Sequence, residues 1–169
     1  IVAVKAGVKP TLSSTQMTFK HKMSRIVIDV TNESGFDITN IVIKGAVGTG
    51  VLDPATGDFT AKADAEASDL IANTATANKV YYALLVPQNG VKLMVTVTTA
   101  DGKKRTQTLG TADFKSGENR RMECNVQPAD IEVKFSGPIT GWVDGDDLLP
   151  DGEGEVETPT VEWGGVKYE

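Results

Sequence analysis

The sequence predicts an all-β protein, a sandwich of about seven to nine strands. Its 169 residues include 47 β-branched side chains (19 Val, 9 Ile and 19 Thr) but only 9 Leu, and β-branched side chains fit a pleated sheet better than a helix. Hydrophobic residues also recur with a period of two along much of the chain, which is typical of strands with one buried face. A chain of this length forms one domain, or one domain and a tail.

The alternating segments define the expected strands. In residues 26–30 every even-numbered side chain is aliphatic, and apolar side chains recur with the same period at the even positions of residues 80–86 and the odd positions of residues 91–97. The segment with Met17, Phe19, His21 and Met23 on one face is a weaker candidate. In chain order the expected strands are residues 17–23, 26–30, 38–44, 80–86, 91–99, 103–109, 121–127 and 131–135.

Turn residues separate these strands. Pro87-Gln88-Asn89-Gly90 predicts a tight hairpin, because proline removes a hydrogen-bond donor and Asn-Gly tolerates positive φ. Ala100-Asp101-Gly102 predicts a second hairpin leading to an edge-like strand, and Pro128-Ala129-Asp130 a third turn. Residues 53–57 predict a turn as well. Residues 61–78 hold seven alanines without an apolar stripe, so we expect a long loop with one helical turn near residues 65–70.

Composition argues against several classes of function. A net charge of −6 and a pI near 4.8 oppose binding to a phosphate backbone, so nucleic acid is a poor partner. The longest apolar stretch, residues 80–86, is far shorter than the roughly 20 residues of a membrane-spanning helix. The chain starts at Ile1 without an apolar leader, so we interpret it as a processed product or a fragment.

Few residues could support catalysis or bind a metal. His21 is the single histidine, so a zinc site is not expected, and a local hydrogen bond explains it better than a catalytic triad. Cys124 alternates in step with Met122 and Val126, which indicates a buried core thiol. We therefore expect no enzyme activity and no cofactor.

The C-terminal part changes character after Trp142. Seven acidic residues and no basic ones lie between residues 144 and 157, so the rest of the chain is close to neutral. Among them Asp144, Asp146 and Asp147 form a weak calcium candidate that lacks the spacing of an EF-hand loop. Residues 160–168 regain strand composition, with Val161 and Trp163 on one face. The two tryptophans that flank the acidic segment are either anchors that dock it or platforms for a sugar ring.

Four short segments together resemble the Bacteroidales fimbrillin-like family. Phe19-Lys20-His21-Lys22-Met23-Ser24-Arg25 resembles its F-x-H-x-x-S-[KR] strand, and Val86-Pro87-Gln88 resembles its VPQ strand end. Residues 114–119 resemble the approach to its penultimate strand, although the usual aromatic residue is absent at 119–121. Ile139-Thr140-Gly141-Trp142 resembles its closing I-x-x-W.

The resemblance implies a transthyretin-like Greek-key β-sandwich over residues 1–142, followed by an acidic linker and strand-like tail over residues 143–169. It further implies a lipoprotein carried to the outer membrane and a subunit of a cell-surface fimbria, or pilus, that contributes to adhesion. Its partners would be other fimbrial subunits, joined by donor-strand exchange. The donor candidates are Val161, Trp163, Val166 and Tyr168.

The alternative is a glycan-binding surface domain that uses Trp142 and Trp163. In that case its partner would be a host or bacterial surface glycan or protein.

Overall fold

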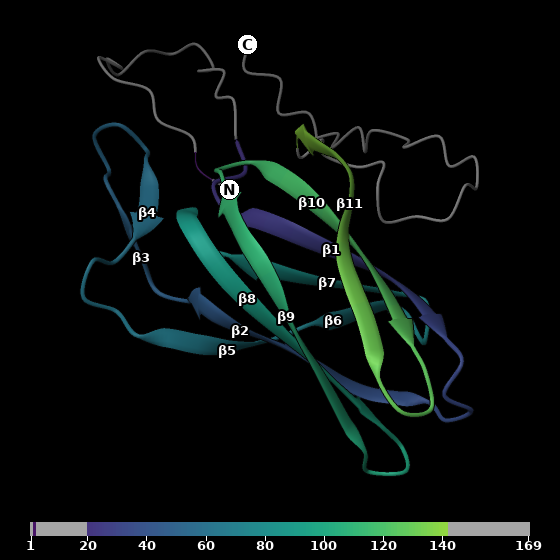
Figure 1. The fold of residues 1–169 in the computed structure, drawn as a ribbon. Coiled ribbons are helices and arrows are strands. Elements are labelled where there is room, and N and C mark those ends of the chain that lie inside the picture. The colour runs from purple at the N-terminus through teal and green to yellow at the C-terminus, as the bar shows by residue number, and fades with distance from the viewer. Residues whose placement is uncertain (1, 3–19, 142–169) are drawn as a thin grey trace, which may run out of the picture.

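A computed structural model describes Val2 and residues 20–141 as a sandwich of two sheets with a small hairpin at its side (Figure 1). No helix that could span a membrane occurs in this part of the chain. The all-β sandwich that the sequence predicts is confirmed. The strands are β1 (Ser24–Asn32), β2 (Ile38–Val47), β3 (Gly50–Leu52), β4 (Phe59–Ala61), β5 (Ala67–Ile71), β6 (Asn73–Thr76), β7 (Val80–Leu85), β8 (Gln88–Thr99), β9 (Lys104–Phe114), β10 (Glu118–Val126) and β11 (Ile131–Gly141).

The two main sheets contain five and four strands. The five-stranded sheet has the order β11-β10-β1-β7-β6, in which β1 and β10 are parallel and the other pairs are antiparallel. The four-stranded sheet has the order β5-β2-β8-β9 and is antiparallel throughout. Strands β3 and β4 pair only with each other.

The core lies between the two main sheets. Side chains of alternate residues point into it, as expected for strands with one buried face. From the five-stranded sheet Ile26, Ile28 and Met122 are fully buried, and from the four-stranded sheet Leu93 and Val95 are. Cys124 belongs to the same cluster, so the prediction of a buried thiol is confirmed, and burial raises the pKa of this thiol to about 11.

Two predicted turns are confirmed. Strands β8 and β9 form an antiparallel hairpin in which Gly102 has a φ of 79°. Strands β10 and β11 are joined by residues 127–130, where the Gln127 amide donates to the Asp130 carbonyl. Strand β9 is an edge of its sheet, as its polar composition predicts.

The predicted hairpin at residues 87–90 is wrong, because β7 and β8 belong to different sheets. Asn89 and Gly90 lie within β8, where the register with β9 shifts between Gln88 and Val91. Gly90 has a φ of 66°, and its amide donates to the Asp113 carboxylate. The Asn-Gly pair therefore makes a bulge rather than a turn, since a bulge also requires a residue that tolerates positive φ.

The predicted loop over residues 61–78 is also wrong, because it contains strands β5 and β6. Each is one of the two edge strands of its sheet and is mostly exposed, so neither shows an apolar stripe. The chain passes from one sheet to the other at the buried Ala72, whose amide donates to the Ile41 carbonyl.

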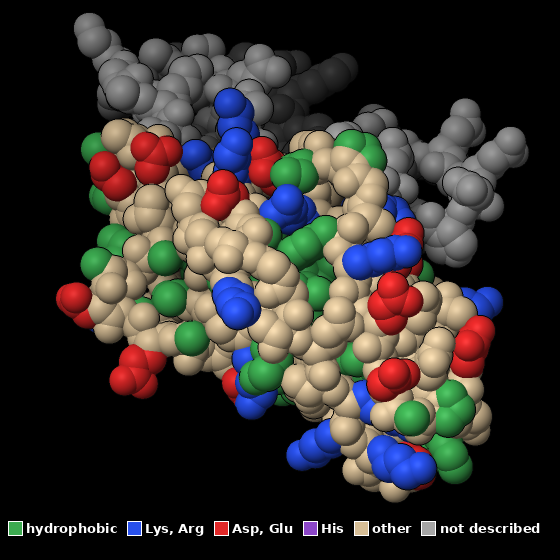
Figure 2. Space-filling view, in the orientation of Figure 1, with side chains coloured by type: hydrophobic (Ala, Val, Ile, Leu, Met, Phe, Trp, Pro, Cys, Tyr) green, Lys and Arg blue, Asp and Glu red, His purple; other side chains and the backbone are tan. Residues whose placement is uncertain are grey.

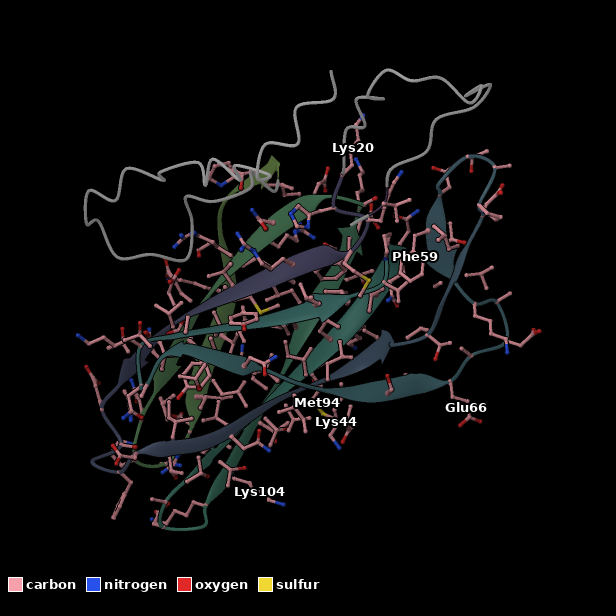
Figure 3. The ribbon with its side chains drawn as sticks, turned by 180° about the vertical axis from the view of Figure 1, so that it is seen from behind. Lys20, Lys44, Phe59, Glu66, Met94 and Lys104 are labelled. Carbon is pink, nitrogen blue, oxygen red and sulfur yellow. The ribbon has the colours of Figure 1, made fainter. Side chains whose placement is uncertain are left out.

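Two smaller features complete the fold. The short strands β3 and β4 were not expected, and the Phe59 ring covers the backbone at Gly50 so closely that a Cβ there would lie 2.4 Å from it (Figure 3). The turn predicted at residues 53–57 joins them, with the Gly57 amide donating to the Asp53 carbonyl. Residues 21–23 are not in a strand, which contradicts that part of the weak candidate at residues 17–23.

Candidate functional site

Many residues that the sequence nominates lie outside the described part of the chain. These are the donor-strand candidates Val161, Trp163, Val166 and Tyr168, the tryptophan Trp142, and the calcium candidates Asp144, Asp146 and Asp147. Among Val2 and residues 20–141, no group of three His, Cys, Asp or Glu side chains could hold a metal ion. Within the described residues, the candidate binding sites are therefore surfaces and sheet edges.

Ser24 and Arg25, from the first matching segment, are both buried. The Ser24 hydroxyl donates to the Glu118 carbonyl (3.3 Å), and the Arg25 Nε donates to the Asn119 Oδ1 (2.8 Å). Asn119 in turn donates from its Nδ2 to the Gly141 carbonyl (3.3 Å). These bonds join the ends of β1, β10 and β11, so the matching residues fix the point from which the tail departs.

Gln88, from the second matching segment, closes a backbone gap with its side chain. Its Oε1 accepts from the Val47 amide, and its Nε2 donates to the Val47 carbonyl, both at 3.0 Å. The same Nε2 donates to the Val86 carbonyl at 2.8 Å. One side-chain amide thus supplies the donor and acceptor that a neighbouring strand would otherwise supply to the end of β2.

Gln107 makes the same arrangement between the two main sheets. Its Nε2 donates to the Val133 carbonyl at 3.0 Å, and its Oε1 accepts from the Val133 amide at 2.5 Å. Strands β9 and β11 are the facing edges of their sheets and do not pair by backbone hydrogen bonds. We call this line of contact the β9–β11 seam; it comprises Arg105, Gln107, Phe114, Arg120, Val133 and Phe135.

Arg105 links the two sheets at the end of the seam near the β8–β9 hairpin. Its guanidinium is buried and donates to the Thr99 hydroxyl (2.7 Å) and to the Pro128 carbonyl (2.8 Å). The Thr99 hydroxyl donates to Asp101 at 2.6 Å, and this hydrogen bond is the main reason that the pKa of Asp101 is lowered. A chain of polar groups therefore links the hairpin of one sheet to the turn of the other.

The opposite end of the seam is filled by aromatic side chains. The rings of Phe114 and Phe135 lie 6.2 Å apart between centroids, and the Arg120 guanidinium lies 5.5 and 4.8 Å from them. Cations interact favourably with aromatic faces at such distances. Hydrophobic side chains are visible between β9 and β11 in Figure 2. The register of β10 with β11 shifts beside Arg120, so this end of the seam is irregular.

Sequence reasoning missed Gln107 and Arg120, although one signal was present. Arg105, Gln107 and Leu109 alternate with exposed residues, so two polar side chains occupy inward-facing positions of β9. A polar residue at such a position needs a hydrogen-bond partner. For Arg120 the sequence offers no comparable signal, because its position follows from the bulge between β10 and β11.

The outer face of the four-stranded sheet does not provide a comparable site. Lys44 and Met94 lie beside each other there (Figure 3), and Lys44 pairs with Asp69 at 2.9 Å. On the other sheet Lys134 pairs with Glu123 at 3.0 Å, and the hydrogen bond and charge of Glu123 raise the pKa of Lys134. Exposed pairs of this kind contribute little to stability and mark solvated surface.

Comparison with solved structures supports the fold. Similar structures include a putative cell adhesion protein from Bacteroides ovatus (TM-score 0.59, 21% identity, 77% of this chain and 49% of that one). A putative cell adhesion protein from Bacteroides uniformis is also similar, with a TM-score of 0.62 and 15% identity over 76% of this chain and 54% of that one. So is the C-terminally truncated tip fimbrial protein Mfa3 from Porphyromonas gingivalis, with a TM-score of 0.51 and 10% identity over 73% of this chain and 52% of that one. The chain thus spans about half the length of these proteins.

A comparison with the curated proteins found no match. The family model described as fimbrillin-like matches residues 1–142, which include both glutamine contacts and the buried Ser24–Arg25 pair. The chain therefore belongs to the fimbrillin-like family.

Proposed function

We propose that this chain is a structural, non-enzymatic subunit of a cell-surface fimbria that assembles by strand addition and contributes to adhesion. Membership in the fimbrillin-like family supports the fimbrial role. The single observation that supports strand addition is the Gln107 contact, in which a side chain occupies a hydrogen-bonding position of the β11 edge. A strand of a second subunit would satisfy the same backbone groups.

The acceptor in this proposal is the β9–β11 seam. An incoming strand would pair with β11 at Val133 after displacing the Gln107 amide, which breaks no backbone ladder. Its apolar side chains would contact the partly buried Phe135, which packs on the buried Phe114 at the end of the seam covered by Arg120. Backbone hydrogen bonds supply affinity in strand addition, and such contacts supply specificity.

The donor in this proposal is residues 156–169 of another copy or of a related subunit. Val161 and Trp163 share one face of an extended strand, and Val166 and Tyr168 share one face beyond the Gly pair. Residues 143–155 would act as an acidic linker between the domain of residues 1–142 and this strand. A surface location follows from the role, and anchoring as an outer-membrane lipoprotein is part of the proposal.

Deletion of residues 144–169 tests the proposal. Unboiled cell-surface preparations of the intact protein should give a ladder of multimers that collapses on boiling, and the deletion should reduce it to a monomer band. Trp163→Asp should have the same effect, whereas Glu162→Gln, one position away and on the opposite strand face, should not. If the deletion leaves self-association unchanged, the tail is not the donor.

A further inference from the structure

An open hollow with a mixed polar and apolar lining lies at the end of the sandwich where the β1–β2 loop meets the turn before β7. Its volume is about 590 Å³, which is within the range of small-molecule sites. Its lining includes Thr31, Asn32, Phe36, Asp37, Asn78 and Lys79. It is separate from the β9–β11 seam and shares no residue with it.

Two asparagine side chains hold the loop that forms the hollow. Asn32 accepts from the Ser34 hydroxyl (2.7 Å) and amide (3.1 Å), and it donates to the Phe36 carbonyl at 2.8 Å. Asn78 accepts from the Ile38 amide at 2.7 Å and donates to the Asp37 Oδ1 at 2.8 Å. Both ends of the loop are therefore fixed before any ligand arrives, which lowers the entropy cost of binding.

The backbone at Asn78 has an unusual conformation. Its φ is 59°, and it is the one non-glycine residue with positive φ among the described residues. The Tyr81 hydroxyl accepts from its amide at 3.2 Å. Asparagine adopts this left-handed conformation more readily than most residues, and here the hydrogen bonds with Ile38, Asp37 and Tyr81 fix it.

Phe36 gives the hollow an apolar side. Its side chain is 48% exposed although the loop beneath it is held by hydrogen bonds, so packing within the domain does not explain its position. Asp37 and Lys79 are also exposed and carry opposite charges. The hollow thus has an aromatic side chain next to hydrogen-bonding groups whose charges cancel. Such a lining fits a ligand that has an apolar face and several hydroxyl groups.

From this geometry we infer that the hollow binds a neutral pyranose sugar. The C–H face of the ring packs on Phe36, and its hydroxyl groups bond to the Asp37 carboxylate, the Lys79 ammonium and the Thr31 hydroxyl. An anionic ligand is disfavoured, because Asp37 offsets the charge of Lys79. This site does not depend on the proposed assembly, since the tail and the seam take no part in it.

The test measures binding of lactose, cellobiose and N-acetylglucosamine to the full chain by saturation-transfer NMR and calorimetry. We expect binding of at least one sugar with a Kd in the millimolar range. Phe36→Ala should weaken it about tenfold, and Asp37→Asn should weaken it while keeping an oxygen for Asn78 to bond. Leu52→Ala is the matched control, since Leu52 is similarly exposed (43%) on β3.

Three results would overturn the inference. The first is no binding of any of these sugars up to about 10 mM, and the second is binding that Phe36→Ala leaves unchanged. The third is a preference for glucuronic acid over the neutral sugars. Thermal melting of each variant separates lost binding from lost folding, and the multimer ladder of the same samples separates sugar binding from assembly.

Discussion

Replacing Gln107 with alanine should destabilise the domain through the loss of two hydrogen bonds to one residue. The Val133 amide and carbonyl would both lose their partner on the β9 side. A typical hydrogen bond contributes about 1 kcal/mol net, and a buried group left unsatisfied costs about 1–3 kcal/mol. Val133 is only 2% exposed, so water reaches its backbone poorly. We therefore expect a loss of about 2–3 kcal/mol in the free energy of unfolding.

Urea denaturation followed by circular dichroism measures this loss. With a slope of about 2 kcal/mol per molar, the midpoint should fall by about 1 M. Gln107→Glu should cost at least as much, because a carboxylate cannot donate to the Val133 carbonyl. Thr106→Ala is the control, since the Thr106 hydroxyl shares a hydrogen bond with the Thr96 hydroxyl in an exposed pair. Equal midpoints for Gln107→Ala and Thr106→Ala would refute the assigned role of Gln107.

Three further outcomes follow from the packing and the charges. The buried Cys124 thiol, with a pKa raised to about 11, should react with a thiol reagent at pH 8 only as fast as the domain opens, and equally fast reaction of native and urea-unfolded protein would contradict this. Asp101, whose pKa the Thr99 hydroxyl lowers, should stabilise the fold above its ordinary pKa of 3.8 and lose that contribution as the pH falls, so Asp101→Asn should flatten the acid side of the stability profile. Gly45→Ala should cost several kcal/mol, because a Cβ there would lie 2.3 Å from a backbone oxygen at a φ of 97°, whereas Gly90→Ala, with open space at a φ of 66°, should cost only about 1 kcal/mol in calorimetry.

Alternation in the sequence identifies the buried face of β8 but not that of β7, where Val80, Tyr82 and Leu84 were expected inside and Tyr81, Ala83 and Leu85 are buried instead. It also does not identify the sheet that a strand joins. Residues 80–85 and 91–97 alternate in the same way, yet they belong to different sheets. The Asn-Gly pair between them suits a hairpin and a bulge equally well, because both use positive φ. Nothing local separates the two, since the choice depends on the long-range pairing of β7 with β1 and of β8 with β2.

The edge strands β5 and β6 were not predicted from the sequence. Strands β5 and β6 have exposed side chains on both faces, so their sequence resembles a loop, and their β structure comes from pairing with β2 and β7. The buried thiol of Cys124 and the edge position of β9 were predictable because each depends on local pattern alone. The contacts of Gln107 were not predictable, because they depend on the position of β9 opposite β11 in the folded sandwich.

Two glutamine side chains close backbone gaps in this domain, but only one of them lies where a strand from another subunit could enter. Gln88 contacts Val47 beside the segment that joins β7 to β8, whereas the contact of Gln107 with Val133 lies between two strands, β9 and β11, that do not pair with each other. If the seam accepts a donor strand, opening the Gln107 contact costs about 2 kcal/mol and weakens strand binding about thirtyfold. Gln107→Ala should therefore lower stability but raise multimer formation of the full chain on unboiled gels. Gln88→Ala removes the equivalent contact with Val47, away from the seam, and should lower stability without raising assembly. If both variants assemble less than the unmodified chain, Gln107 is a structural brace and the acceptor lies elsewhere.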